Sequence, residues 1–191
     1  MIDHLIDSVS RIKPGRVLLV TNNRFFEPFL TWAFKRKFPF PLHILNDGAG
    51  HPEERRGAVL DLYHALSSSL AAEEDSLVLS TDHYFDYPLS LFLLTGLHHL
   101  PNPAIGVYDL KDSQLADRYG VIEINQEHRV IRWTQKPAHP AGSLVSVGIY
   151  LVSRDAPEDL HKYLERGKRN PDRLDDFFAW LAPRKPALAA T

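Results

Sequence analysis

The sequence of 191 residues contains no cysteine, which excludes disulfide bonds, zinc–thiolate sites and thiol catalysis. No apolar run is long enough to cross a bilayer, and the first residues do not have the composition of a secretory signal. We therefore expect a cytoplasmic protein with no membrane partner. The formal net charge of -2 gives no electrostatic case for binding nucleic acid.

Hydrophobic residues make up 44% of the chain, enough for a sizeable core in one domain. Short apolar runs that predict strands alternate four times with segments of helical periodicity, and two segments of alternating polarity then predict a hairpin. This order predicts an α/β fold with a mainly parallel sheet and an antiparallel addition. We expect a single domain over residues 1–182 and a flexible Ala- and Pro-rich tail over 183–191.

An acidic residue, Asp82, comes just after the apolar run of residues 76–80. Open α/β sheets bind ligands at the carboxyl ends of their strands. A carboxylate at such a position offers the hard oxygen ligand that suits a magnesium ion carrying phosphates. The alternative is an acid that caps the next turn. Asp82 is therefore a candidate metal ligand.

Two further segments follow predicted strands or begin predicted helices. The Gly-rich loop of residues 46–50 contains Asp47 and lies where a phosphate or a base could bind, although it lacks the P-loop ending and a simple turn is the alternative. Gly57 and Ala58 begin a helix, and small residues there would let the backbone approach a flat base edge. Ordinary helix packing is the alternative for this pair.

Lys136 directly follows a predicted strand and precedes Pro137. A lysine held rigid by a following proline could reach a phosphate as a point charge, whereas a surface lysine before a turn is the alternative. Gly148 lies inside a predicted strand. A glycine in that setting often marks the close approach of a ligand or of another backbone.

Taken in order, these segments resemble the sugar-phosphate nucleotidylyltransferases, and in particular glucose-1-phosphate thymidylyltransferase-like proteins. The resemblance runs over nearly the whole chain, to near Leu181. The segments that carry it are Val20-Thr21-Asn22-Asn23, Asn46-Asp47-Gly48, Arg55-Arg56-Gly57-Ala58, Leu79-Ser80-Thr81-Asp82, Tyr119-Gly120-Val121-Ile122-Glu123, Gln135-Lys136-Pro137 and Val147-Gly148-Ile149-Tyr150.

The resemblance implies a Rossmann-like nucleotidyltransferase fold of the glycosyltransferase A type, with a mixed sheet. It implies that a nucleoside triphosphate and a sugar 1-phosphate give a nucleotide sugar and pyrophosphate. Asp82 would bind Mg²⁺ and Lys136 the sugar phosphate. The residues implied to contact substrate are Asp47, Gly57 and Ala58 around the base, and Gly120, Gln135 and Gly148 around the sugar. Gln135 stands where the family has a glutamate, and an amide presents a different donor and acceptor pattern to sugar hydroxyls.

The resemblance also implies departures from the family. The family's first strand, its Gly-rich loop with an arginine and its second metal-binding aspartate have no counterpart in these residues. Because phosphoryl-type transfer depends on positioning and electrostatic stabilisation, we expect the chain alone to be weak or inactive. A non-catalytic nucleotide-sugar binding or assembly module and a glycosyltransferase remain as alternatives. An uncovered sheet edge predicts self-association into a homo-oligomer.

Overall fold

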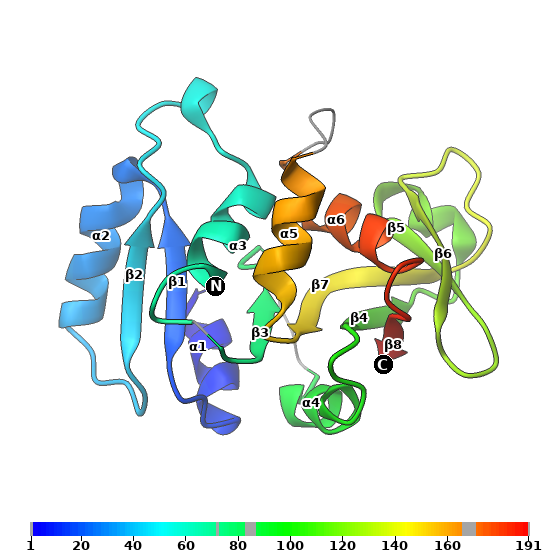
Figure 1. Ribbon diagram of the computed structural model, residues 1–191, viewed down its shortest axis with the longest axis horizontal. Coiled ribbons are helices and arrows are strands. Elements are labelled where there is room, and N and C mark those ends of the chain that lie inside the picture. The colour runs from blue at the N-terminus through cyan, green and yellow to red at the C-terminus, as the bar shows by residue number, and fades with distance from the viewer. Residues whose placement is uncertain (1, 72, 83–86, 166–170, 191) are drawn as a thin grey trace.

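The computed structural model describes residues 2–71, 73–82, 87–165 and 171–190 (Figure 1). The α-helices are α1 (Ile2–Arg11), α2 (Asn23–Phe34), α3 (Ala58–Leu66), α4 (Leu89–Leu97), α5 (Ala156–Leu164) and α6 (Leu174–Leu181). The strands are β1 (Val17–Thr21), β2 (Leu42–Asn46), β3 (Ser76–Leu79), β4 (Ala104–Asp109), β5 (Gly120–Ile124), β6 (Val130–Gln135), β7 (Leu144–Val152) and β8 (Leu188–Ala190). The 3₁₀ helices η1 (Pro52–Glu54) and η2 (Ser113–Arg118) lie in the connections.

The strands form two sheets. Strands β1 and β2 make a parallel pair. The larger sheet has the order β6-β5-β7-β4-β8, and β3 also pairs with β7. In this larger sheet only β4 and β8 run parallel, and the other pairs are antiparallel. The fold is therefore mixed α/β, as the sequence predicts.

The expectation of a mainly parallel sheet was wrong, and strand β7 is the reason. Strands β3 and β4 each follow a helix, which is the pattern of parallel crossover units. Both instead pair with β7, which comes later in the chain and runs against them. β7 is nine residues long and almost entirely buried, so it is the central strand on which the larger sheet is built.

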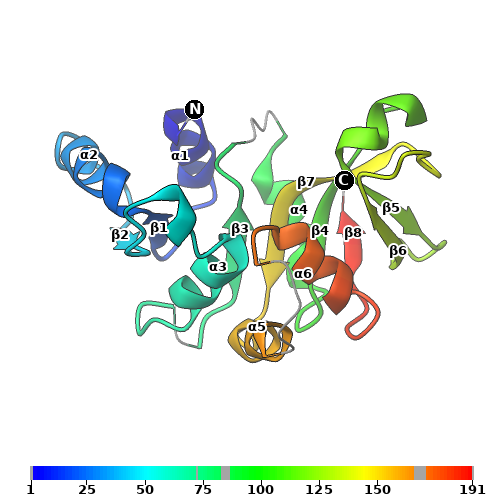
Figure 2. The same cartoon turned by 90° about the horizontal axis from the view of Figure 1, so that it is seen from above.

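Helices cover both faces of the strands, and each face has its own core (Figure 2). The larger core includes residues of α3, α5 and α6, among them Phe177, Phe178 and Tyr163. The second core joins residues of α1 and α4, such as Val9 and Phe92, to the opposite face of β3 and β7. Burial of these large apolar side chains is the main force that holds the layers together.

The turns after β1 and β2 are joined by side-chain hydrogen bonds. The side chain of Asn22 accepts a 3.2 Å bond from the amide of Phe25 and so caps α2. Nδ2 of Asn46 donates to Oδ1 of Asn23 at 2.6 Å, and Nδ2 of Asn23 donates to the carbonyl of Gly48 at 2.8 Å. The polar residues that predict turns from the sequence therefore fix the carboxyl end of the small sheet.

The predicted hairpin is confirmed as the antiparallel pair β5–β6. Oδ1 of Asn125 accepts the amides of Glu127 and Arg129 at 3.0 and 2.9 Å, which closes the turn. His128 adopts a positive φ of 57° in this turn. The hairpin brings Gly120 and Gln135 opposite each other at its far end, and both are predicted site residues.

The end of the chain differs from the flexible tail expected over residues 183–191. Strand β8 pairs in parallel with β4, and Ala187, Ala189 and Ala190 are buried. The small apolar side chains of β8 pack at the edge of the sheet beside β4. The hydrogen bonds between β8 and β4 pair backbone groups that would otherwise need water as a partner. In the described part of the chain, no helix combines the length and apolar composition that a bilayer crossing requires.

Candidate functional site

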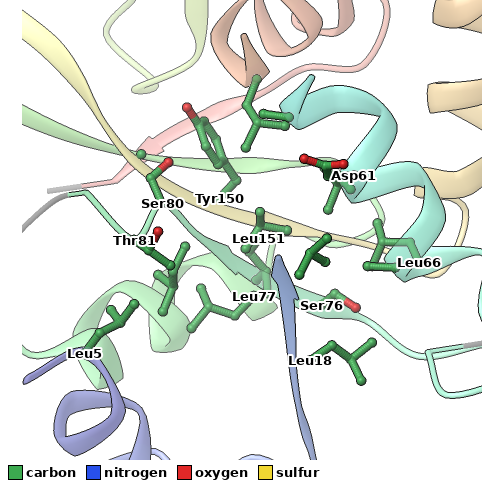
Figure 3. Close-up of a pocket in the computed structure, with 18 of the residues that line it drawn as sticks. Leu5, Leu18, Asp61, Leu66, Ser76, Leu77, Ser80, Thr81, Tyr150 and Leu151 are labelled. Atoms are coloured by element: carbon green, nitrogen blue, oxygen red, sulfur yellow. The ribbon is translucent and has the colours of Figure 1, made fainter. Parts of the chain in front are cut away.

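A cavity of about 1070 Å³ lies between the two sheets, with its walls on α1, β1, α3, β3 and α4 (Figure 3). It extends to the loops and strands at the end of the β5–β6 hairpin. Its lining includes most of the predicted site residues: Ala58, Asp82, Gly120, Gln135, Lys136 and Gly148. These residues come from separate parts of the sequence, and the fold brings them to one place.

The cavity has a polar end and an apolar end. In Figure 3 the side chains of Ser80 and Tyr150 lie close together, and Asp61 lies on the same upper side of the view, whereas Leu18 and Leu77 lie below them together with Ser76. The polar end is at the carboxyl end of β3. This is the position at which open α/β sheets bind their ligands, so the polar end is the candidate site.

Asp82 lies at this polar end, three residues beyond the last residue of β3. It is exposed, and its negative charge is one of the causes that raise the pKa of Tyr150. Asp82 therefore lies near the phenol of a residue on the central strand. It lines the same cavity as Lys136 and the start of α3, as the magnesium interpretation requires.

Lys136 begins the turn after β6 with an unusual backbone. Its φ is 41°, in the left-handed region that non-glycine residues rarely adopt. The amide of Lys136 donates a 3.0 Å hydrogen bond to the carbonyl of Tyr119, which holds this turn against the start of β5. The exposed side chain is thus carried on a fixed backbone beside the cavity.

Three polar side chains crowd the position of Gly120. A methyl group built there would lie 2.5 Å from Nε1 of Trp133, and 3.1 Å from both Oδ2 of Asp175 and Nε2 of Gln135. The two nitrogens are buried and lack a hydrogen-bond partner among the described residues. Because buried donors are almost always paired, these two N–H groups are suited to a polar ligand beside Gly120.

A hydrogen-bonded set of three side chains lines the same end of the cavity. The hydroxyl of Tyr150 donates to Oδ1 of Asp175 at 2.6 Å, and the hydroxyl of Ser146 donates to the same oxygen at 3.0 Å. Burial, followed by the charge of Asp175, raises the pKa of Tyr150 well above its ordinary value. The phenol therefore stays protonated and acts as a donor.

The sequence predictions missed this set, although part of the signal was present. Ser146, Gly148 and Tyr150 alternate along β7 and so belong to one face of the strand. Gly148 was singled out, and its even-numbered neighbours share its face. Asp175 lies in the first turn of α6. An acidic residue at that position is usually interpreted as stabilising the amino end of the helix. Only the fold brings Asp175 under β7.

Asp61 on α3 was also missed. Burial, with the charge of Asp47 as the next cause, raises its pKa from 3.8 to about 6. Its Oδ1 is buried and lacks a hydrogen-bond partner within the described residues. A half-buried carboxyl with an unusual pKa beside a cavity is a common feature of functional sites. From the sequence alone, Asp61 is only a polar residue within a predicted helix.

Asp47 and Gly57 lie outside the cavity lining. Asp47 is buried, and its Oδ1 accepts a 2.7 Å bond from the amide of Ala49 within its own turn. Gly57 has a φ of 86°, and a Cβ there would lie 2.5 Å from the carbonyl oxygen of Pro171. The same carbonyl accepts the amide of Val59 at 2.8 Å. The contacts of both residues are with the chain itself, and their roles toward a base remain predictions.

The donor set at the polar end fits a hard cation. Asp82 offers a carboxylate at the open edge of the cavity, and the neighbouring Thr81 and Ser80 offer hydroxyl oxygens. Magnesium is usually bound by one or two carboxylates together with substrate phosphates and water. No group of three or more His, Asp or Glu side chains suited to a metal occurs among the described residues. Asp82 would thus need phosphate or water as further ligands in order to hold an ion.

Comparison with known proteins identifies the family to which this chain belongs. The model of the nucleotidyl transferase family matches residues 1–190, so the chain belongs to that family. Solved structures agree on the fold. One from Bacillus anthracis, assigned as a glucose-1-phosphate thymidylyltransferase, covers 99% of this chain and 72% of its own with a TM-score of 0.80 at 14% identity. An apo UDP-glucose pyrophosphorylase covers 100% of this chain and 78% of its own with a TM-score of 0.73 at 16% identity.

Curated relatives share more of the sequence. The mannose-1-phosphate guanylyltransferase regulatory subunit alpha of Sus scrofa is 27% identical over 186 residues, which are 94% of this chain and 43% of that protein. The glucose-1-phosphate adenylyltransferase of Bacillus thuringiensis (strain Al Hakam) is 30% identical over 122 residues, 63% of this chain and 31% of the relative. The chain thus spans less than half the length of the curated relatives it matches.

Proposed function

We propose that this chain carries a site of the sugar-1-phosphate nucleotidyltransferase type, which acts in nucleotide-sugar biosynthesis. One observation carries the proposal: residues dispersed between Ala58 and Gly148 line one cavity at the carboxyl end of β3. Membership of the nucleotidyl transferase family supports it. A cytoplasmic location, expected from the sequence, belongs to the same proposal.

The reaction transfers a nucleotidyl group between two phosphates. An oxygen of the sugar 1-phosphate attacks the α-phosphorus of the nucleoside triphosphate and forms a new P–O–P bond. The bond between the α-phosphorus and the α,β-bridging oxygen breaks, and pyrophosphate leaves with that electron pair. The protein forms no covalent bond with the substrates in this step, so its residues act by positioning the phosphates and by balancing their charge.

Asp82 and Lys136 are the proposed phosphate-handling residues. Lys136 supplies a positive charge toward the sugar phosphate from a turn that is fixed by its bond to Tyr119. Asp82 would hold Mg²⁺, which neutralises phosphate charge when it is bound. Both side chains line the cavity, and opposite charges there suit the two ends of a metal–phosphate assembly.

The sugar is proposed to bind beside Gly120 and Gly148. Nε2 of Gln135 is a buried donor that a sugar hydroxyl can satisfy, and Nε1 of Trp133 is a second. The absence of a side chain at Gly120 lets these two groups approach the backbone of β5 closely, because a Cβ there would lie 2.5 Å from Nε1 of Trp133. The base is proposed to lie toward Ala58 at the start of α3, with Asp47 and Gly57 shaping the loop beneath it.

A second candidate function is a non-catalytic, nucleotide-sugar-binding subunit. The observation that favours it is the Sus scrofa relative, which matches 94% of this chain and is named a regulatory subunit. Such a subunit would use the sugar side of the cavity without transferring a nucleotidyl group. The two functions differ in turnover but not in binding, so one experiment separates them.

The experiment measures binding and turnover with the same ligands. ATP, GTP, UTP and dTTP are each combined with Mg²⁺ and either glucose 1-phosphate or mannose 1-phosphate, and pyrophosphate release is recorded. The corresponding nucleoside diphosphate glucoses (ADP-, GDP-, UDP- and dTDP-glucose) are titrated in parallel by calorimetry. Pyrophosphate release that Asp82→Asn lowers at least 100-fold supports the enzyme, because the variant loses only the metal-binding charge. Asp7→Asn, an exposed change on α1, serves as the matched control.

The alternative outcomes are distinct. Nucleotide-sugar binding without pyrophosphate release supports the binding subunit. If no nucleotide sugar binds and no pyrophosphate is released with any pair, both functions are excluded for this chain. Equal rates in the wild type and Asp82→Asn would keep the activity but remove Asp82 from it.

A further inference from the structure

Helix α2 lies at the outer end of the molecule, beside strand β2 and away from the larger sheet (Figures 1 and 2). No residue of α2, all of which the structure describes, lines the cavity. Most of its residues are Phe, Trp, Leu or Ala, yet none of them is buried. A helix of that composition normally buries one face fully against its neighbours. The helix therefore exposes more apolar surface than its packing on β2 uses.

The inner face of α2 is fixed by aromatic and polar contacts. Nε1 of Trp32 donates to Oδ1 of Asp3 on α1 at 3.0 Å, and Arg36 forms a 3.0 Å ion pair with the same oxygen. The ring of Trp32 contacts those of Phe29 and Phe38, with centroids 6.0 and 5.4 Å away. Because these contacts hold one side of α2 toward the protein, the opposite side is held outward.

The outer face of α2 carries exposed apolar side chains and two opposite charges. Phe34 is 94% exposed, more than any other large apolar side chain among the described residues. Leu30, one turn before it, is 38% exposed. Glu27 and Lys35 are exposed too, and neither forms an ion pair within the described part of the chain. Neighbouring exposed apolar residues rimmed by charges are a feature of interaction surfaces.

The two charges make this face complementary to itself. Glu27 comes four residues before Thr31, and Lys35 comes four residues after it. At about 1.5 Å per residue, each charge lies about 6 Å along the helix axis from Thr31, in opposite directions. A twofold axis at the level of Thr31 therefore brings Glu27 level with Lys35 of an antiparallel copy, and it forms the reciprocal pair as well.

The same twofold axis brings the apolar residues together. Leu30 lies next to the axis, so its two copies would meet near the centre of the interface. Phe34 lies one turn away and would pack across the turn that contains Pro28 of the other copy. Its ring would lose most of its contact with water, and burial of apolar surface is the main driving force of most protein association.

We propose that two copies of this chain associate through the outer faces of α2, as antiparallel helices related by a twofold axis near Thr31. Leu30 and Phe34 form the apolar centre of the interface. Two reciprocal pairs of Glu27 with Lys35 set its direction. The cavity stays open in this dimer, because α2 does not line it.

A second copy fits this face better than an anionic membrane surface does. Lys35, Arg36 and Lys37 are consecutive, and a basic cluster beside an exposed aromatic ring would suit lipid phosphates. Arg36 is already paired with Asp3, however, and Glu27 would lie against the same anionic surface. A face that holds both charges in self-complementary positions favours its own copy.

The first test is sedimentation velocity on the full 191-residue chain, from about 1 to 500 µM. One helix face per copy makes a small interface, so we expect a weak dimer with a Kd of about 10 to 100 µM. Phe34→Ser should raise this Kd at least tenfold. Leu94→Ser, at a position on α4 that is 63% exposed, is the matched control and should leave the Kd unchanged. A monomer at every concentration, or a dimer that Phe34→Ser does not weaken, would overturn the proposal.

Exchange of the two charges tests the pairing itself. Glu27→Lys and Lys35→Glu should each raise the Kd at least fivefold, because like charges then face each other. The double variant restores opposite charges, so its Kd should return to within about twofold of the wild-type value. A double variant as weak as either single variant would contradict the reciprocal pairs.

Single thiols test the direction of the two helices. The chain has no cysteine, so Thr31→Cys places one thiol per copy beside the twofold axis. Arg24→Cys, on the same exposed face and about 10 Å along the helix, is the matched control. With copper–phenanthroline as oxidant, Thr31→Cys should form a disulfide-linked dimer at least tenfold faster than Arg24→Cys. Equal rates would exclude the antiparallel arrangement, and a monomer that sediments with phosphatidylserine vesicles would replace the second copy with a lipid surface.

Discussion

The phenol of Tyr150 and the carboxylate of Asp175 are joined by a 2.6 Å hydrogen bond across the polar end of the cavity. The bond links the central strand β7 to the first turn of α6. The ring of Tyr150 also stacks on Phe178 of α6, with ring centroids 4.0 Å apart. This pair therefore fixes α6 beneath the sheet and orients Asp175 toward Gly120.

Tyr150→Phe should lower the free energy of unfolding by about 1.5 kcal/mol. The change keeps the stacked ring but leaves Asp175 without its shorter hydrogen bond, and bonds to charged groups contribute about 1.5–3 kcal/mol. Urea denaturation at pH 7 measures the effect. Tyr108→Phe is the matched control, because Tyr108 is 61% exposed. Equal stabilities of the two variants would contradict the structural role of this pair.

Asp61 should make the chain more stable at mildly acid pH than at neutral pH. Its pKa rises from 3.8 to about 6 on folding, so the folded state binds more protons between these values. Stability contributed by this group is full below pH 3.8 and is lost as the pH rises through 6. Asp61→Asn should therefore be stabilising at pH 7, by on the order of 1 kcal/mol after allowance for solvent screening, and nearly neutral at pH 4. Urea denaturation of both proteins at the two pH values measures this; a variant that is less stable at pH 7 would contradict it.

Gly120→Ala should weaken the binding of any nucleotide sugar and lower stability by about 1–3 kcal/mol. The added methyl group would lie 2.5 Å from Nε1 of Trp133, so the surrounding side chains must move. Gly142→Ala is the control, since a Cβ there has no atom within 4 Å. Calorimetric titration and urea denaturation together measure both effects. Unchanged affinity in a folded Gly120→Ala protein would remove Gly120 from the site.

Gly57→Ala tests whether that glycine serves packing or a base. Its positive φ and the nearby carbonyl of Pro171 predict a loss of about 2 kcal/mol or more in stability. Gly15→Ala, in open space, should change stability by less than about 0.5 kcal/mol. Urea denaturation compares the two. If Gly57→Ala keeps full stability but loses nucleotide affinity, the base-binding interpretation is the better one.

Much of the fold was predictable because its signals are local. The hairpin β5–β6 follows from alternating apolar residues around a polar turn, and its pairing of Gly120 with Gln135 follows from that register. The direction of β3 and β4 relative to β7 was not predictable in this way. A strand's partners depend on which buried surfaces fit together over long distances, and the sequence around β3 reads the same in either direction.

The residues of the candidate site also differ in whether a local sequence signal or only the packing of distant segments reveals them. Asp82 and Lys136 could be singled out from the sequence because each follows a predicted strand, and both line the cavity. Their meeting could not be predicted from strand direction, because β3 and β6 belong to a mostly antiparallel sheet. Asp175 could not be singled out, because its importance comes from helix α6 packing under β7, which places an ordinary first-turn acid beside Tyr150. The strand β8 was also missed, because three small residues in an Ala- and Pro-rich segment carry little pattern.

The most direct test of the account is a double-mutant cycle on Asp82 and Lys136, because its central claim is that both act on one metal–phosphate assembly. The affinity of the best-bound nucleotide diphosphate glucose is measured by calorimetry, with and without Mg²⁺, for the wild type, Asp82→Asn, Lys136→Gln and the double variant. We predict that Mg²⁺ strengthens binding at least tenfold in the wild type but not in Asp82→Asn, and that the two changes are non-additive by about 1 kcal/mol. Additive effects together with an unchanged response of Asp82→Asn to Mg²⁺ would contradict the account.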